Sequence, residues 1–189
     1  ILEHAKAVVV MNAFSKQILL EEYGAKEQDI AVIPHGIPYV ASPDGQQEKQ
    51  RMGLENNFVL STFGLLSPGK GIEYALQALP RVVKRFPQVL YFIIGVTHPT
   101  VRKETGETYR NFLHREVERL RLQNNVRFYN KYLSLEEIVS FLRSTDVYVS
   151  PSLDRNQSVS GTLSYALGCG TPVVCTDSLY ARSLVTPDT

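Results

Sequence analysis

Residues 58–94 read FVLSTFGLLSPGKGIEYALQALPRVVKRFPQVLYFII, and this stretch decides the fold. Its two ends, residues 58–63 and 89–94, are short and almost wholly apolar. Such runs are typical of strands in a parallel sheet whose two faces are both covered. Between them, apolar residues recur at helical spacing from Ile72 to Phe86, which predicts an amphipathic helix. Strand, helix and strand in this order predict a right-handed crossover between two parallel strands.

The same alternation continues toward the end of the chain. Further strands are expected at residues 126–129, 147–149 and 172–175, and further helices at 109–120, 135–142, 163–167 and 180–185. Five strands that alternate with helices predict an α/β fold with a doubly wound, Rossmann-like parallel sheet. Within helix 72–86, Pro80 should bend or split the helix, because proline removes a backbone hydrogen bond.

Composition divides the chain into three parts. Residues 1–36 contain an apolar strand at 7–11, a helix that starts near Asn12, and a second strand that ends before Pro34-His35-Gly36. Residues 37–57 are polar and rich in turns, so they are interpreted as a linker with one short helix near residues 46–52. Residues 58–189 form the main α/β domain. Because the chain begins with Ile1 and ends soon after a helix-like stretch, we expect a fragment cut at both ends.

The composition excludes several classes of protein. Of the 189 residues, 43% are hydrophobic and 21% are charged, which is the balance of a globular protein with a real core. The net charge of +1 gives no overall attraction to nucleic acid. No apolar run is long enough for a membrane span, and no signal-peptide pattern opens the chain. Cys169 and Cys175 cannot form a disulfide framework or a zinc site unaided, and the four histidines lack metal-ligand spacing.

Ligands of open parallel sheets bind beyond the carboxyl ends of the strands, so the strand-to-helix loops are the candidate sites. The loop of residues 63–71 carries Gly64, Gly69 and Lys70 just before a helix N-terminus. Glycines allow close approach to the backbone, and the helix dipole and the lysine favour an anion, such as a phosphate. The alternative is a tight turn with a solvated lysine. The loop is not a Walker motif, because the required spacing is absent.

A second loop, residues 150–162, is long, polar and rich in small hydroxyl residues. The backbone N–H groups of Val159, Ser160, Gly161 and Thr162 can face an anion at the start of the next helix. Ser160 or Thr162 can also simply cap that helix, and capping is compatible with anion binding.

Two further loops offer single side chains. His98, in the loop of residues 95–99, can donate to a ligand oxygen, although a lone loop histidine is often only exposed to solvent. Tyr132 can flank a nucleobase, whereas the neighbouring Ser134 and Glu137 are explained by a capping box. No catalytic triad and no nucleophile elbow are present.

Four motifs occur in a fixed order: residues 33–37 (IPHGI), 63–71 (FGLLSPGKG), 146–152 (DVYVSPS) and 166–174 (ALGCGTPVV). Together they resemble the carboxyl-terminal half of a retaining, nucleotide-sugar-dependent glycosyltransferase of the group 1 (family four) type, which has the two-domain GT-B fold. The resemblance implies that residues 1–36 are the last strand-helix-strand unit of the amino-terminal domain and the crossing point. It also implies that the main domain holds the donor and is truncated at its end, and that the missing half holds the acceptor.

The resemblance also implies individual roles. The family loop Gly-Arg-Leu-x3-Lys-Gly places a catalytic lysine at Lys70 but an aliphatic Leu65 at the arginine position. The family pair Glu-x7-Glu falls on Gln157 and Tyr165, and Tyr165 can grip a ribose only through its hydroxyl. Arg155 is a candidate replacement for the missing arginine. The implied nucleotide-sugar-binding residues are Gly64, Leu65, Gly69, His98, Tyr132, Arg155, Gln157, Val159, Ser160, Gly161, Thr162 and Tyr165.

The implied reaction is transfer of a hexose, with retention, from a UDP- or GDP-sugar to a glycan or lipid-linked acceptor. The resemblance also implies a cytoplasmic enzyme of polysaccharide biosynthesis that can lie peripheral to the membrane. It implies that the enzyme needs no metal or other cofactor. This fragment alone should bind nucleotide weakly and turn over little. Two alternatives stay open. The departures at Leu65, Gln157 and Tyr165 favour a non-catalytic GT-B-like nucleotide-binding or scaffolding domain, and Asp154 is the one loop carboxylate available to a sugar-nucleotide epimerase.

Overall fold

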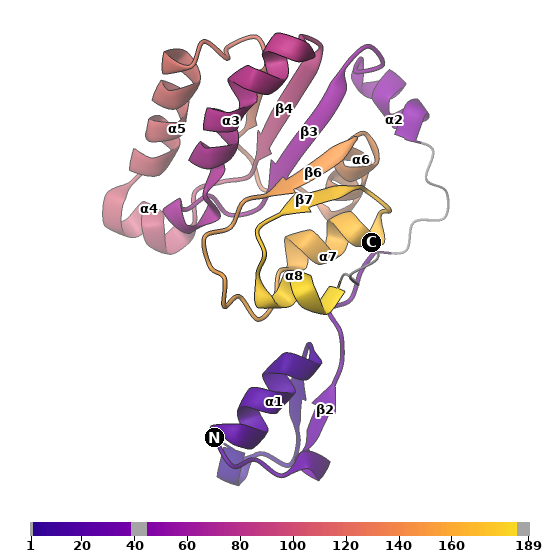
Figure 1. Cartoon of the computed structure of the whole chain (residues 1–189), viewed down its shortest axis with the longest axis vertical. Coiled ribbons are helices and arrows are strands. Elements are labelled where there is room, and N and C mark those ends of the chain that lie inside the picture. Colours follow the sequence, from indigo (N-terminus) through magenta and orange to yellow (C-terminus); the bar gives the residue numbers. More distant parts are fainter. Residues whose placement is uncertain (1, 39–44, 185–189) are drawn as a thin grey trace.

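The computed structural model describes residues 2–38 and 45–184, and its main body is a five-stranded parallel sheet in the order β5-β4-β3-β6-β7 (Figure 1). The strands are β3 (Phe58–Phe63), β4 (Val89–Ile94), β5 (Val126–Tyr129), β6 (Val147–Ser150) and β7 (Val173–Cys175). The chain moves outward from β3 to β5 and then returns to place β6 on the other side of β3. This is the doubly wound topology expected from the sequence, and its switch point lies between β3 and β6.

Helices cover both faces of the sheet (Figure 1). They are α2 (Gly45–Met52), α3 (Ile72–Arg85), α4 (Pro99–Thr105), α5 (Thr108–Arg119), α6 (Leu135–Arg143), α7 (Gly161–Gly168) and α8 (Leu179–Leu184). The residues of β4 alternate between two cores: Tyr91 and Ile93 pack with α3 and α5, whereas Phe92 and Ile94 pack with α6 and α7. Every residue of β4 is buried, which explains why the strand is apolar on both faces.

Two local features differ from the expectations: the possible split at Pro80 does not occur, and one helix is additional. Helix α3 is not split at Pro80 but continues as one helix from Ile72 to Arg85. Leu76 and Leu79, which precede the proline, are buried, and Val83, which follows it, packs against the same core, so packing offsets the one hydrogen bond that is lost. Helix α4 was not expected, because Val101 is its single apolar side chain besides Pro99 and the seven residues carry no apolar stripe. Pro99 at its first position and the His98 cap start this helix instead.

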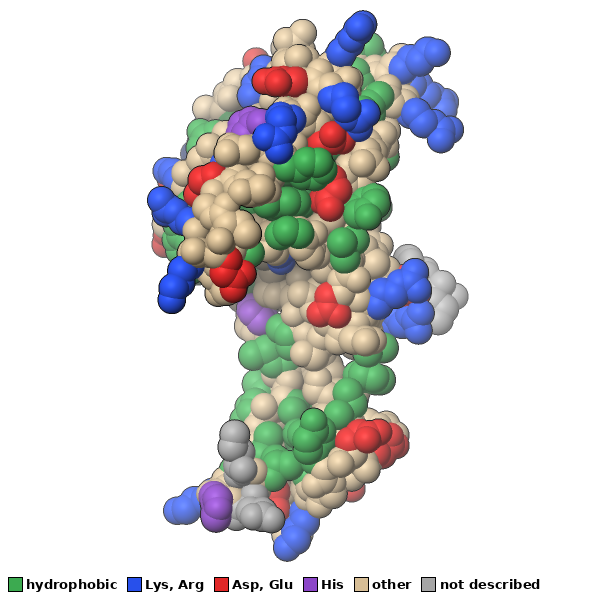
Figure 2. Space-filling model, turned by 90° about the vertical axis from the view of Figure 1, so that its left-hand side faces the viewer, with side chains coloured by type: hydrophobic (Ala, Val, Ile, Leu, Met, Phe, Trp, Pro, Cys, Tyr) green, Lys and Arg blue, Asp and Glu red, His purple; other side chains and the backbone are tan. Residues whose placement is uncertain are grey.

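The first part of the chain forms a separate two-stranded parallel sheet of β1 (Val8–Val10) and β2 (Ile30–Val32), joined by α1 (Ala13–Glu21) and flanked by short 3-10 turns. It lies beyond the α8 end of the main body and is connected to it by residues 33–38 and by a hydrogen bond from Asn12 to the carbonyl oxygen of Ser158 (Figure 1). Figure 2 shows hydrophobic side chains gathered on this unit. The exposed ones include Val9, Met11, Phe14, Ile18, Val32 and Ile33.

The linker helix near residues 46–52 is present as α2, whereas residues 39–44 of the expected linker and the end of the last expected helix, residue 185, lie outside the described residues. None of the described helices combines the length and the apolar character that a membrane crossing requires.

Candidate functional site

A cavity of about 310 Å³ lies beyond the carboxyl ends of β3 and β4, where the loops after these strands face the N-terminus of α7. This is the place where the switch point of a doubly wound sheet leaves a crevice for ligands. Its walls are formed by His35, Phe63, Gly64, Leu65, Ile94, Gly95, Val96, Lys131, Tyr132, Leu133, Ile138, Gly161, Thr162 and Tyr165. This described lining contains no Asp or Glu, so no carboxylate of the wall repels an anion.

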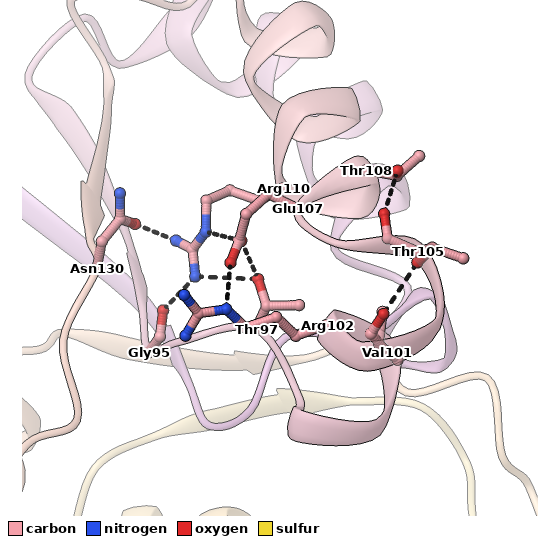
Figure 3. A network of polar contacts seen from close by, with 9 residues as sticks. All are labelled: Gly95, Thr97, Val101, Arg102, Thr105, Glu107, Thr108, Arg110 and Asn130. Atoms are coloured by element: carbon pink, nitrogen blue, oxygen red, sulfur yellow. Dashed lines mark hydrogen bonds and ion pairs between the residues drawn. The ribbon is translucent and has the colours of Figure 1, made fainter.

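One wall is held by a buried arginine, Arg110 of α5 (Figure 3). Its guanidinium donates to the carbonyl oxygen of Gly95 over 2.9 Å and to the side-chain oxygen of Asn130, which directly follows β5. Glu107 accepts from the same guanidinium and from Thr97. The loops after β4 and β5 are therefore tied to one side chain.

The opposite wall is the N-terminus of α7. Ser160 caps the helix as expected: its hydroxyl accepts from the N–H of Leu163, and its carbonyl accepts from the N–H of Ser164. Gly161 and Thr162 are the first two helical residues, and their N–H groups have no acceptor within residues 2–38 and 45–184. Free N–H groups and the positive end of the helix dipole favour an anion at this point.

Lys70 brings a full positive charge to the same point. The position that a Cβ atom on Gly64 would occupy lies 4.0 Å from Lys70 Nζ and 3.3 Å from the methyl group of Thr162. Lys70 therefore reaches across the loop of β3 toward the start of α7. No carboxylate of the described part of the chain pairs with its ammonium group. Burial lowers the pKa of Lys70 from its usual value, as expected for a charge that lacks a partner.

An aromatic wall closes the remaining side of the cavity. Tyr165 of α7 lies 5.6 Å from His35, edge to face, and 6.4 Å from Phe63 in a stacked arrangement, both measured between ring centres. The family resemblance aligns Tyr165 with a glutamate that is expected to grip the ribose. Its ring is thus packed into the wall, and its hydroxyl is the polar group that remains at this position.

The structure brings together only part of the predicted site. Six predicted residues line the cavity: Gly64, Leu65, Tyr132, Gly161, Thr162 and Tyr165. Lys70 lies at its edge. The side chain of Tyr132 is 82% exposed, so it stands at the mouth of the cavity rather than inside it.

The other predicted residues do not line the cavity. His98 accepts from Thr100 N–H as the cap of α4, and Gly69 accepts from the N–H of Leu153 through its carbonyl oxygen. Ser160 is used as the α7 cap, and Val159 packs near α8. The carbonyl oxygens of Arg155 and Gln157 accept from Leu179 and Tyr180, so the backbone of their loop is tied to α8.

Sequence reasoning did not select eight residues of the wall: His35, Phe63, Ile94, Gly95, Val96, Lys131, Leu133 and Ile138. His35 and Lys131 each follow a strand, β2 and β5, so the rule that points to strand-to-helix loops could have found them. Phe63 is the last residue of β3 and gave no signal beyond its apolar character. No group of three or more His, Cys, Asp or Glu side chains in the described segments is placed to hold a metal ion.

The family model described as glycosyl transferases group 1 matches residues 44–189. Mannosylfructose-phosphate synthase of Agrobacterium fabrum is 28% identical over 175 residues, which cover 89% of this chain and 37% of that protein. D-inositol 3-phosphate glycosyltransferase of Corynebacterium efficiens is 30% identical over 162 residues, with 82% and 37% covered. The chain therefore spans less than half the length of these relatives.

A solved structure shows the same fold. Anabaena Alr3699/HepE in complex with UDP-glucose superposes with a TM-score of 0.73 at 25% identity. The match covers 96% of this chain and 47% of that one. The architecture of one sheet flanked by helices is thus shared over nearly the whole of the present chain.

Proposed function

The chain belongs to the glycosyl transferases group 1, and we propose that its cavity binds the nucleoside diphosphate part of a sugar donor. The observation that carries this proposal is the ammonium group of Lys70. It approaches the start of α7 past Gly64, where the N–H groups of Gly161 and Thr162 are free, and it has no carboxylate partner in the described structure. Because an unpaired, half-buried charge is costly, a bound anion would supply the partner that the protein does not. The complex of Alr3699/HepE with UDP-glucose supports a nucleotide sugar as that anion.

The same groups suit the chemistry of sugar transfer. Breaking the bond between sugar and phosphate builds negative charge on the diphosphate. Lys70 and the start of α7 would stabilise this charge, and one well-placed donor in such a site contributes about 3 kcal/mol to the transition state. Since the protein's own groups supply positive charge, we expect transfer by the whole protein to persist in EDTA, and loss of activity there would contradict this part of the proposal.

For the whole protein we propose transfer of a hexose, with retention, to a glycan or lipid-linked acceptor. We propose further that residues 1–36 belong to the domain that binds the acceptor. The exposed apolar side chains of α1 and β2, such as Phe14, Ile18 and Val32, support this assignment, because such a surface is normally covered. Retention is tested by determining the anomeric configuration of the product by NMR, and an inverted product would contradict it.

Binding is tested by calorimetric titration of the chain with UDP, GDP and uridine. UDP or GDP should bind, and uridine should bind much more weakly, since it lacks the diphosphate. At 100 times its dissociation constant, the ligand should stabilise the chain by about 2.7 kcal/mol in thermal unfolding. No heat and no thermal shift with any nucleoside diphosphate at millimolar concentration would contradict the proposed function.

A second candidate is a non-catalytic nucleotide-binding domain. It is favoured by the aliphatic Leu65 and the aromatic Tyr165, which line the cavity where the resembling family carries charged side chains. Nucleotide binding without transfer from any of several sugar nucleotides, measured on the whole protein, would support this candidate. An epimerase is disfavoured, because Asp154 does not line the cavity; its carboxylate accepts from Asn156 N–H within its own loop.

A further inference from the structure

We propose that His35 binds the diphosphate of the donor as an imidazolium and supplies the second positive charge of the site. This inference rests on the proposed function of the cavity. His35 belongs to the segment between β2 and α2, far in sequence from the loops of the main sheet. It would replace in space the arginine that the sequence lacks at Leu65.

The position of the ring supports this role. His35 lines the cavity, and its Nε2 atom lies 2.8 Å from the position that a Cβ atom on Gly161 would occupy. Only glycine therefore fits at the first residue of α7 with the ring in this place. The ring stands over the same helix N-terminus whose N–H groups are free, while Lys70 approaches that N-terminus past Gly64.

The hydrogen bond of the ring determines which of its nitrogen atoms carries the hydrogen in the neutral form. Nδ1 lies 2.7 Å from the carbonyl oxygen of Gly36, and a carbonyl oxygen only accepts, so Nδ1 carries the hydrogen. Nε2 has no partner among the residues that the structure describes. In neutral His35, Nε2 would present a lone pair, which repels an anion. In the cation, Nε2 carries a hydrogen and can donate to a phosphate oxygen. Anion binding at this atom therefore requires the imidazolium.

The charged and titratable groups around His35 decide whether the protein itself can stabilise the imidazolium. The titratable or charged groups that face His35 are Tyr165 of α7 and, around the cavity, Lys70, Lys131 and Tyr132. None carries a carboxylate, and the carboxylate of Glu137 is already paired with Lys131, so no carboxylate of the described wall holds the imidazolium in the absence of ligand. The negative charge has to come from the ligand itself, and an anion bound between His35 and Lys70 would favour the protonated ring.

The test compares dissociation constants for UDP and uridine in the wild type, His35→Phe and His35→Gln, at pH 6 and pH 8. His35→Phe keeps a ring of similar shape without nitrogen. It should weaken UDP binding about tenfold at pH 6 and about twofold at pH 8, and should leave uridine binding unchanged. His35→Gln keeps a hydrogen-bond donor but cannot be charged. The affinity of the wild type for UDP, relative to that of His35→Phe, should be greater at pH 6 than at pH 8. The affinity of His35→Gln relative to His35→Phe should be the same at both pH values. Each variant sees the same nucleotide, so titration of the phosphate cancels in the comparison. His4→Phe, at an exposed histidine, is the matched control and should bind as the wild type does.

The outcomes separate this inference from the proposed function. If the wild type binds UDP and both His35 variants bind it as tightly as the wild type does at pH 6, His35 does not contact the diphosphate, and the proposed function stands. If uridine binding falls as much as UDP binding, His35 holds the nucleoside or the fold, and the inference is again overturned. If the wild type itself does not bind UDP or GDP, both fail together.

Discussion

The position that a Cβ atom on Gly95 would occupy lies 1.9 Å from the carbonyl oxygen of Gly64. The loops after β3 and β4 therefore touch backbone to backbone at the floor of the cavity, and the contact continues in a bridge between Leu66 and Thr97. Both glycines also have φ values near +133°, which other residues rarely adopt. No side chain fits between the two loops, and this closeness shapes the cavity.

Gly95→Ala should therefore destabilise the chain by about 2 to 4 kcal/mol, because the methyl group must displace backbone and the residue must hold a positive φ. Urea denaturation measures the loss. Gly69→Ala is the matched control, since a Cβ there has nothing within 4 Å, and it should change stability by less than about 0.5 kcal/mol. Equal stability of the two variants would show that the loops can separate at little cost.

Arg110→Lys should also weaken both the fold and nucleotide binding. A lysine cannot bond Gly95, Asn130 and Glu107 together as the planar guanidinium does, so buried acceptors lose their donors. We expect a loss of about 2 to 4 kcal/mol in the free energy of unfolding. Arg102→Lys, at an exposed arginine that also pairs with Glu107, should stay within about 0.5 kcal/mol of the wild type. A stable Arg110→Lys variant with full UDP affinity would refute the positioning role of Arg110.

Stability in acid should depend on Glu107. The hydrogen bond from Thr97, followed by the bonds and charge of Arg110, lowers the pKa of Glu107 below its usual value. A carboxylate with a lowered folded pKa contributes stability that is present above the unfolded value and is lost as the pH falls through the folded value. Glu107→Gln should therefore flatten the loss of stability below about pH 4.5. Glu104→Gln, exposed on the neighbouring α4, should keep the wild-type profile in urea denaturation at several pH values. If the free energy of unfolding fell equally steeply with decreasing pH in all three proteins, the contacts of Glu107 with Thr97 and Arg110 would not stabilise the fold.

Lys70→Met should raise the stability of the chain and weaken its binding of UDP. Burial lowers the pKa of Lys70, so at neutral pH the folded state holds this charge less readily than the unfolded state does. The wild type should gain stability as the pH rises toward 10.5, and the variant should lack this gain.

At neutral pH, Lys70→Met should raise the thermal midpoint by about 2 to 4 °C, the shift that corresponds to 1 kcal/mol in a domain of this size. The same variant should weaken UDP binding at least tenfold, as about 1.5 kcal/mol or more is lost with a charged donor. Lys103→Met, at an exposed lysine of α4, serves as the control and should alter neither property. A Lys70 variant that binds UDP normally would remove the main support for the proposed anion site.

The fold was largely readable from the sequence. The apolar runs of β3 and β4, the stripe of α3 and the Ser134–Glu137 capping box are local patterns, and the structure contains each of them. Local patterns do not show where tertiary packing decides, as at Pro80, where helix α3 is not split because Leu76 and Leu79 before the proline and Val83 after it pack into the core. Local patterns also failed for α4, which is too short and polar to show the helical spacing of apolar residues.

The site was readable only in part. Gly64, Gly161 and Thr162 follow from the rule that ligands meet the carboxyl ends of parallel strands, because the main chain presents its groups there whatever the side chains are. Arg155 and Gln157 lie in the correct loop, but the cavity wall does not include them, since spacing along a loop does not tell which way the loop turns.

The order of apolar runs and turns by itself determined that this chain forms a parallel sheet, because burial acts over a few neighbouring residues, and it predicts an anion site at the carboxyl edge of that sheet. Only the tertiary structure decided that His35 stands over Gly161 and that Arg110 joins the loops after β4 and β5. These pairs are distant in the chain, and the free energy that brings them together comes from the packing of the whole sheet rather than from either segment.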